Sequence, residues 1–219
     1  MLLTSFAAAF VLSLTPQTAG PSFDCARATT LSEHAICADP QLARLDRRMA
    51  TAYAALRRSL PATAREALTR DQRWFLGARE EWQENSARPG FRDFPDVAER
   101  MRDRIAFLDS VQTRRVTGLT GSWRNAAGTI EIRPAAKGQV SVAINAANPV
   151  NARWLCDVSG TGQIVNNAVV IAADEGWQVR LTLRGGYLTV EETPAQGGSS
   201  LRPYCGANGH VDGVYLPRR

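Results

Sequence analysis

The spacing of hydrophobic positions changes about halfway along the chain. From Thr29 to about Thr117, apolar residues recur three and four positions apart, which is the spacing of one face of an α-helix. From about Gly118 onward, they alternate with polar residues in short runs, which is typical of half-buried β-strands. The pattern therefore predicts an α+β protein in two domains, with a helical domain over residues 21–117 and a β-domain over residues 118–219.

Four helices are predicted in the first half. Thr30 and Glu33 form a capping-box pattern before the first helix, and Asp39 followed by Pro40 suits the start of the second. Pro61 can start a third helix, and a segment rich in proline and glycine separates it from the fourth. The apolar stripes are Leu42, Leu45, Met49, Tyr53 and Leu56, then Ala64, Leu68, Phe75, Ala78 and Trp82, then Val97, Met101, Ile105 and Leu108. We expect a small antiparallel helical bundle.

About eight short strands are predicted in the second half, separated by turns rich in glycine and asparagine. The segments are GSWRN, GTIEIRP, QVSVAIN, ARWLCDV, NAVVIAA, WQVRLTLRG, YLTVEE and VDGVYLP. Strands at this spacing, with no helix between them, favour a small antiparallel barrel or sandwich. The GSW and GVY segments lie at opposite ends of this half, and they are a pair that could meet to close it.

The first residues of the chain have the pattern of a signal peptide. An apolar run from Leu2 to Leu14 is followed by Pro16 and by small residues near Ala19 and Gly20. The run is too short to anchor a protein in a bilayer, and no later stretch is apolar for long enough to span one. The sequence therefore predicts a cleaved leader over residues 1–20 and a periplasmic or secreted mature protein without a transmembrane segment. The alternative is a buried N-terminal helix.

The four cysteines fall two in each predicted domain: Cys25 and Cys37, then Cys156 and Cys205. In an oxidising compartment, an even number of cysteines indicates disulfides, and pairing within each half is the simplest of three possible connectivities. A zinc site usually takes four ligands from close pairs, whereas this chain has two histidines and no close cysteine pair. A reactive thiol beside a second cysteine would oxidise after export. We therefore expect no metal and no cofactor.

The residues around the first two cysteines form a recognisable pattern. Its matching positions are Asp24, Cys25, Thr30, Glu33, Ile36, Cys37, Asp39, Leu42, Leu45, Asp46 and Tyr53. Further on, QRWFLGARE (Gln72 to Glu80) is similar to a Gln-Arg-x-Trp…Arg-Asp segment, with Phe75 at the usual tryptophan position. Over about residues 23–109, the chain resembles the N-terminal module of the LprI-type lysozyme-inhibitor family of bacterial envelope proteins. The resemblance implies a Cys25–Cys37 disulfide and inhibition of a lysozyme or related muramidase.

Two groups of residues are candidates for contact with a partner. They are Glu80, Glu81 and Glu84 on one predicted helix, and Trp123, Trp154 and Trp177 in the predicted strands. The glutamates would give a local acidic surface to a chain of net charge +5, which binding to a basic lysozyme would need. Two tryptophans on one exposed face would favour a sugar-binding or protein-binding surface. The alternatives are an ordinary solvated helix face and ordinary core packing.

Other chemistry leaves weaker signals. The positive charge comes almost wholly from arginine, which suits the phosphate and carboxylate groups of lipopolysaccharide or peptidoglycan, whereas export disfavours nucleic acid. The chain shows no serine elbow, zinc-protease helix, phosphate loop or dinucleotide fingerprint. The sequence therefore favours a non-enzymatic protein, and the family resemblance implies that it inhibits a lysozyme by occluding the cleft. The alternative is a periplasmic adaptor that binds cell-wall glycan or anionic envelope lipid.

Overall fold

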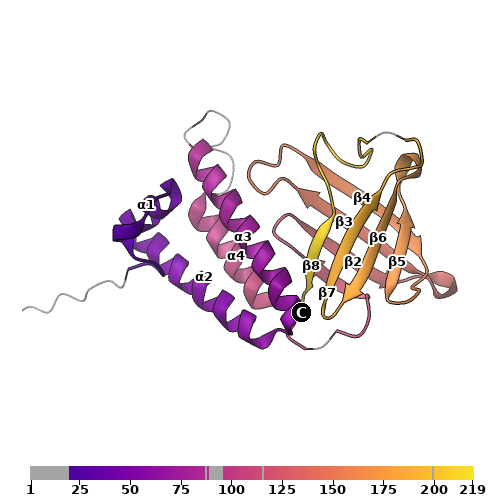
Figure 1. Ribbon diagram of the computed structural model, residues 1–219, viewed down its shortest axis with the longest axis horizontal. Coiled ribbons are helices and arrows are strands. Elements are labelled where there is room, and N and C mark those ends of the chain that lie inside the picture. The colour runs from indigo at the N-terminus through magenta and orange to yellow at the C-terminus, as the bar shows by residue number, and fades with distance from the viewer. Residues whose placement is uncertain (1–19, 87, 89–95, 115, 199) are drawn as a thin grey trace, which may run out of the picture.

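The computed structural model describes residues 20–86, 88, 96–114, 116–198 and 200–219. The expected signal peptide lies outside this part of the chain except for Gly20, and most of the segment rich in proline and glycine before Val97 lies outside it too. A helical domain and a β-domain lie next to each other along the long axis of the molecule (Figure 1). The predicted two-domain α+β architecture is confirmed.

The helical domain begins with a single 3₁₀ turn, η1 (Cys25–Arg27). The helices that follow are α1 (Leu31–Ala38), α2 (Pro40–Ser59), α3 (Ala62–Asn85) and α4 (Val97–Ser110). The capping box is present at α1, because the Thr30 hydroxyl accepts from the amide of Glu33 and the Glu33 carboxylate accepts from the amide of Thr30. A disulfide between Cys25 and Cys37 joins η1 to α1. These local contacts fix the corner at which the chain enters the domain.

The apolar stripes of the helices meet in one core. Its fully or almost fully buried members include Met49 of α2, Leu68 of α3 and Met101 of α4. Two residues from the β-domain, Val150 and Leu216, belong to the same buried cluster. The core of the helical domain is therefore completed by side chains that come from the second half of the chain.

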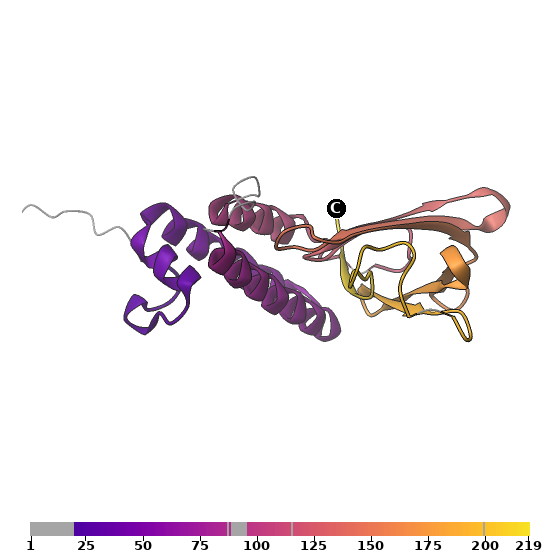
Figure 2. The ribbon, with the colours of Figure 1, turned by 90° about the horizontal axis from the view of Figure 1, so that it is seen from above.

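The β-domain is an antiparallel, nearly closed barrel. Its strands are β1 (Gly121–Arg124), β2 (Gly128–Pro134), β3 (Val140–Ala147), β4 (Leu155–Gly162), β5 (Ala168–Ala172), β6 (Gln178–Arg184), β7 (Tyr187–Thr193) and β8 (Gly213–Pro217). The hydrogen-bonded order is β4-β3-β2-β1-β8-β7-β6-β5, and every neighbouring pair is antiparallel. Seen from above, the strands form two facing layers (Figure 2).

The expected pairing of the GSW and GVY segments is confirmed, because Trp123 in β1 lies opposite Pro217 in β8. The remaining gap in the barrel lies elsewhere, between β4 and β5, the two ends of the hydrogen-bonded order. Gly160 and Gly162 let β4 approach β5 closely. A Cβ atom at position 162 would lie 2.4 Å from the carbonyl oxygen of Val170. The two end strands therefore pack against each other without joining one ladder.

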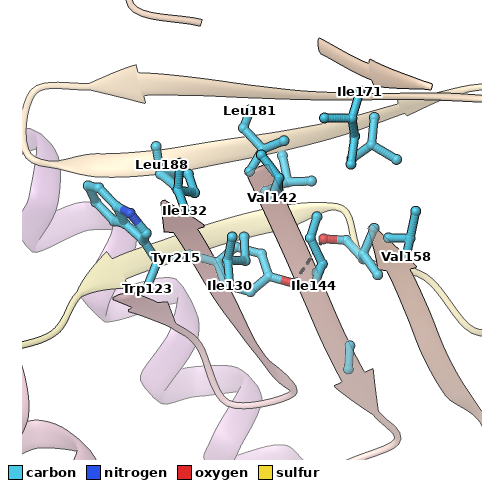
Figure 3. Packing of buried hydrophobic residues seen from close by; sticks show 14 of the residues in the cluster. Trp123, Ile130, Ile132, Val142, Ile144, Val158, Ile171, Leu181, Leu188 and Tyr215 are labelled. Carbon is cyan, nitrogen blue, oxygen red and sulfur yellow. Dashed lines mark hydrogen bonds between the residues drawn. The ribbon is translucent and has the colours of Figure 1, made fainter. Parts of the chain in front are cut away.

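Alternating apolar residues from both layers fill the barrel. Ile130 and Ile132 of β2 lie beside Val142 and Ile144 of β3, and Leu181 faces them from the other layer (Figure 3). A second disulfide, Cys156–Cys205, joins β4 to the connection between β7 and β8. This cross-link closes a long loop over one end of the barrel.

The two domains are joined by several hydrogen bonds. The amide of Gln112, just after α4, donates to the carbonyl of Pro217 at 2.8 Å, and the amide of Arg219 donates to the carbonyl of Ser110 at 2.9 Å. The Asp71 carboxylate of α3 accepts from the amide of Ala126 in the β1–β2 turn at 2.8 Å. These contacts hold α3 and α4 against the β-domain, with α1 on their far side (Figure 1).

Candidate functional site

The three candidate glutamates of α3 divide into two roles. Glu80 accepts hydrogen bonds from the amide and the hydroxyl of Ser32, so it fastens α3 to the first turn of α1. Burial by itself raises the pKa of Glu80, but the hydrogen bonds from Ser32, Thr30 and Leu31 together outweigh burial and the net pKa is lowered. Glu81 and Glu84 remain exposed to solvent. Glu80 is therefore a structural contact, and the other two are available at the surface.

An exposed leucine lies next to these carboxylates. Leu31 precedes Ser32 in α1, and its side chain is 56% exposed. Glu33 lies on the same helix, and hydrogen bonds from the amides of Thr29 and Thr30 lower its pKa. Glu84 follows Glu80 by one helical turn on the same face of α3, the face that contacts α1. We call Leu31, Glu33, Glu81 and Glu84 the acidic end of the helical domain.

The three candidate tryptophans lie in the core of the β-domain, which agrees with the core-packing alternative and not with a partner-binding surface. Trp123, Trp154 and Trp177 are only 1%, 5% and 4% exposed. Trp123 points inward and donates to the carbonyl of Leu119 at 2.8 Å, and the ring of Trp177 packs edge-on against Tyr204. Their large apolar rings stabilise the barrel by burial and present no surface to a partner.

One aromatic residue outside the candidate set reaches the surface near the domain junction. Trp74 of α3 is 36% exposed, and its ring centroid lies 6.4 Å from that of His210. With Asp212 and Arg70 it lines an open hollow between the two domains. The available signal was its position beside Phe75, because two adjacent aromatic residues on a helix cannot both face the core.

Several positions that carry the family resemblance form buried polar contacts between helices. Asp46 of α2 accepts from the amide of Ser22 at 2.8 Å and lies 3.8 Å from a guanidinium nitrogen of Arg79. Gln72 of α3 accepts from Nε of Arg104 in α4 at 2.8 Å. These side chains hold α2, α3, α4 and the N-terminal segment together, so their first role is to build the scaffold.

Residues 25–114 match a family model described as Lysozyme inhibitor LprI. The helical domain is therefore LprI-like, and we call it the LprI module. The match confirms the resemblance recognised in the sequence over about residues 23–109, and it does not extend into the β-domain. No curated protein and no solved structure matches the chain.

The acidic end combines exposed charge with an exposed apolar side chain. It lies on and beside α1, which faces away from the β-domain (Figure 1). The β-domain therefore leaves it uncovered. Within the described ranges, no helix is long and apolar enough to cross a membrane, and no group of three or more histidine, cysteine, aspartate or glutamate side chains is placed to hold a metal ion.

Proposed function

We propose that this protein is an exported, non-catalytic lysozyme inhibitor whose LprI module binds the enzyme and occludes its cleft. The observation that carries the proposal is the match of residues 25–114 to a family described as lysozyme inhibitors. The leader-like residues 1–20 and the two disulfides support a location outside the cytoplasm, where lysozymes reach their substrate.

The acidic end of the module suits such a partner. Glycoside hydrolysis depends on substrate reaching two carboxyl groups in an open cleft, so a protein that covers the cleft stops turnover without any chemistry of its own. Animal lysozymes are typically basic, and this chain also carries a net charge of +5. Attraction must therefore come from local carboxylates such as Glu81 and Glu84, with Leu31 as an apolar contact.

A bacterial-lysis turbidity assay tests the proposal. Mature protein, residues 21–219, is added to lysozymes of several classes, and we expect inhibition at micromolar concentration for at least one class. The Glu81→Gln/Glu84→Gln variant should weaken inhibition about tenfold, because rim and surface charges steer association and fix orientation. The control variant, Glu175→Gln/Glu191→Gln, makes the same charge change on exposed residues of the β-domain and should inhibit like the wild type.

Two results would count against this function. Failure to inhibit any class of lysozyme would exclude the proposed activity. If that failure came with retention on peptidoglycan or lipopolysaccharide, it would favour the alternative role of an envelope adaptor. Equal loss of inhibition in both variants would place the binding surface outside the acidic end.

A further inference from the structure

A pocket of about 130 Å³ lies where the LprI module meets the β-domain. Four arginines line it: Arg79 from α3, Arg100 and Arg104 from α4, and Arg124 from β1. Phe75 and Phe107 form its apolar walls. The guanidinium of Arg104 lies over both phenyl rings, 5.1 Å and 4.7 Å from their centroids, so the rings hold this cation in place.

Positive charge dominates the lining. Asp103 carries the one carboxylate among the described residues that line the pocket. Asp71 and Asp46 lie outside the lining, at 2.7 Å from a guanidinium nitrogen of Arg104 and 3.8 Å from one of Arg79. Both of these aspartates also accept backbone amides, so their carboxylates are already partly engaged with other donors.

Several guanidinium nitrogens in this pocket lack an acceptor. Nη2 of Arg104, and Nε and Nη1 of Arg79, have no hydrogen-bond partner in the part of the chain that the structure describes. These side chains are only 2% and 8% exposed. The guanidinium of Arg124 contacts the ring of Phe107, but this side chain forms no hydrogen bond or ion pair with any described residue. Buried guanidinium donors are normally hydrogen-bonded, so this set requires an acceptor.

Without a bound anion, the surroundings of these arginines disfavour their charged form. Burial lowers the pKa of Arg104, although the Asp71 carboxylate partly restores it. Burial also lowers the pKa of Arg124, and the nearby positive charges of Arg218 and Arg104 lower it further. An anion placed among these side chains would reduce both the desolvation cost and the mutual repulsion.

We propose that this pocket binds a small oxyanion, either a phosphate or a carboxylate group. The planar guanidinium fork matches both groups, because each presents two or more oxygens to paired N–H donors. The volume accommodates an ion of a few atoms. Because the arginines come from α3, α4 and β1, the ligand would bridge the two domains. This inference does not depend on lysozyme inhibition.

The test compares three sodium salts at constant ionic strength: phosphate, acetate and chloride. Calorimetric titration of the full mature protein should show one saturable site for phosphate or acetate, and thermal unfolding should shift upward with the same ligand. Arg124→Gln should weaken binding at least tenfold, because it removes a lining guanidinium whose other contact is the ring of Phe107. Arg184→Gln removes an exposed strand arginine of β6 and should bind like the wild type. Arg124→Lys keeps the charge but loses the fork, so it should recover only part of the affinity.

Each outcome decides the matter. Saturable binding of phosphate alone supports a phosphate-bearing ligand, and binding of acetate supports a carboxylate. Equal stabilisation by all three salts would overturn the proposal, because it would reflect ionic strength alone. Equal affinity in wild type and Arg124→Gln would also overturn it, because the anion would then bind elsewhere.

Discussion

The buried ion pair between Asp71 and Arg104 offers a sharp test of how the two domains are held together. The two side chains are 1% and 2% exposed, and the closest oxygen and nitrogen lie 2.7 Å apart. Asp71 also accepts from the amide of Ala126, so it links α3, α4 and the β1–β2 turn. Arg104→Met removes the cation while keeping a long apolar side chain between Phe75 and Phe107.

The expected cost follows from what the variant leaves behind. Removing one partner of a buried pair leaves an uncompensated charge, which costs about 3–5 kcal/mol of unfolding free energy. For a chain of this length, that cost corresponds to a fall in melting temperature of roughly 10 °C. Adding Asp71→Asn removes the buried charge and keeps an oxygen for the Ala126 amide. The double variant should therefore recover to within about 1–2 kcal/mol of the wild type.

Urea unfolding followed by circular dichroism measures both variants and a control. Arg48→Met breaks an exposed pair with Asp109, where the side chains are 68% and 54% exposed, and it should cost less than about 1 kcal/mol. A cost below about 1 kcal/mol for Arg104→Met would refute the argument, because a buried aspartate would then tolerate the loss of its partner. A double variant less stable than Arg104→Met alone would refute it as well.

Three further changes test other parts of the structure. Replacing both cysteines of the Cys25–Cys37 disulfide with serine should lower the free energy of unfolding by about 3 kcal/mol, because the unfolded chain regains the entropy of the short loop. An unchanged melting temperature would contradict a stabilising role for this disulfide. Gly162→Ala should lower the melting temperature because the new methyl group meets the backbone of β5, whereas Gly118→Ala, which meets nothing within 4 Å, should not. The lowered pKa of Glu33 means that its carboxylate stabilises the fold above the unfolded value of 4.5 and stops doing so as the pH falls through the folded pKa. Glu33→Gln should therefore be less stable than wild type at pH 7, the difference should shrink as the pH falls below 4.5, and a difference that stays constant with falling pH would contradict this role.

Features set by local chemistry were accessible from the sequence. The capping box of Thr30 and Glu33 and the start of α2 at Pro40 each involve atoms only a few residues apart. The strands were recognisable because alternation reports which face of a strand is buried. The β1–β8 pair was suggested by the position of its two segments at opposite ends of the β-half. The close packing of β4 against β5 could not be predicted, because Gly160 and Gly162 are equally typical of an ordinary turn.

The junction pocket could not be found from the pattern. Arg79, Arg104 and Arg124 are far apart in sequence, and an arginine on an amphipathic helix is usually exposed. Arg104 did leave a faint signal, since it stands three positions after Met101, next to the apolar stripe of α4. The sequence also left the burial of the tryptophans undecided, because an aromatic residue in a strand suits a core and a binding face equally well.

The boundary of the family match and the boundary of the helical core do not coincide. The match ends at residue 114, yet Val150 and Leu216, only 2% and 1% exposed, are packed among the helices. During synthesis, all four helices leave the ribosome well before β8, which carries Leu216 and pairs with β1. Neither domain can reach its finished packing until that strand arrives. The finished packing of both halves of this protein therefore depends on β8.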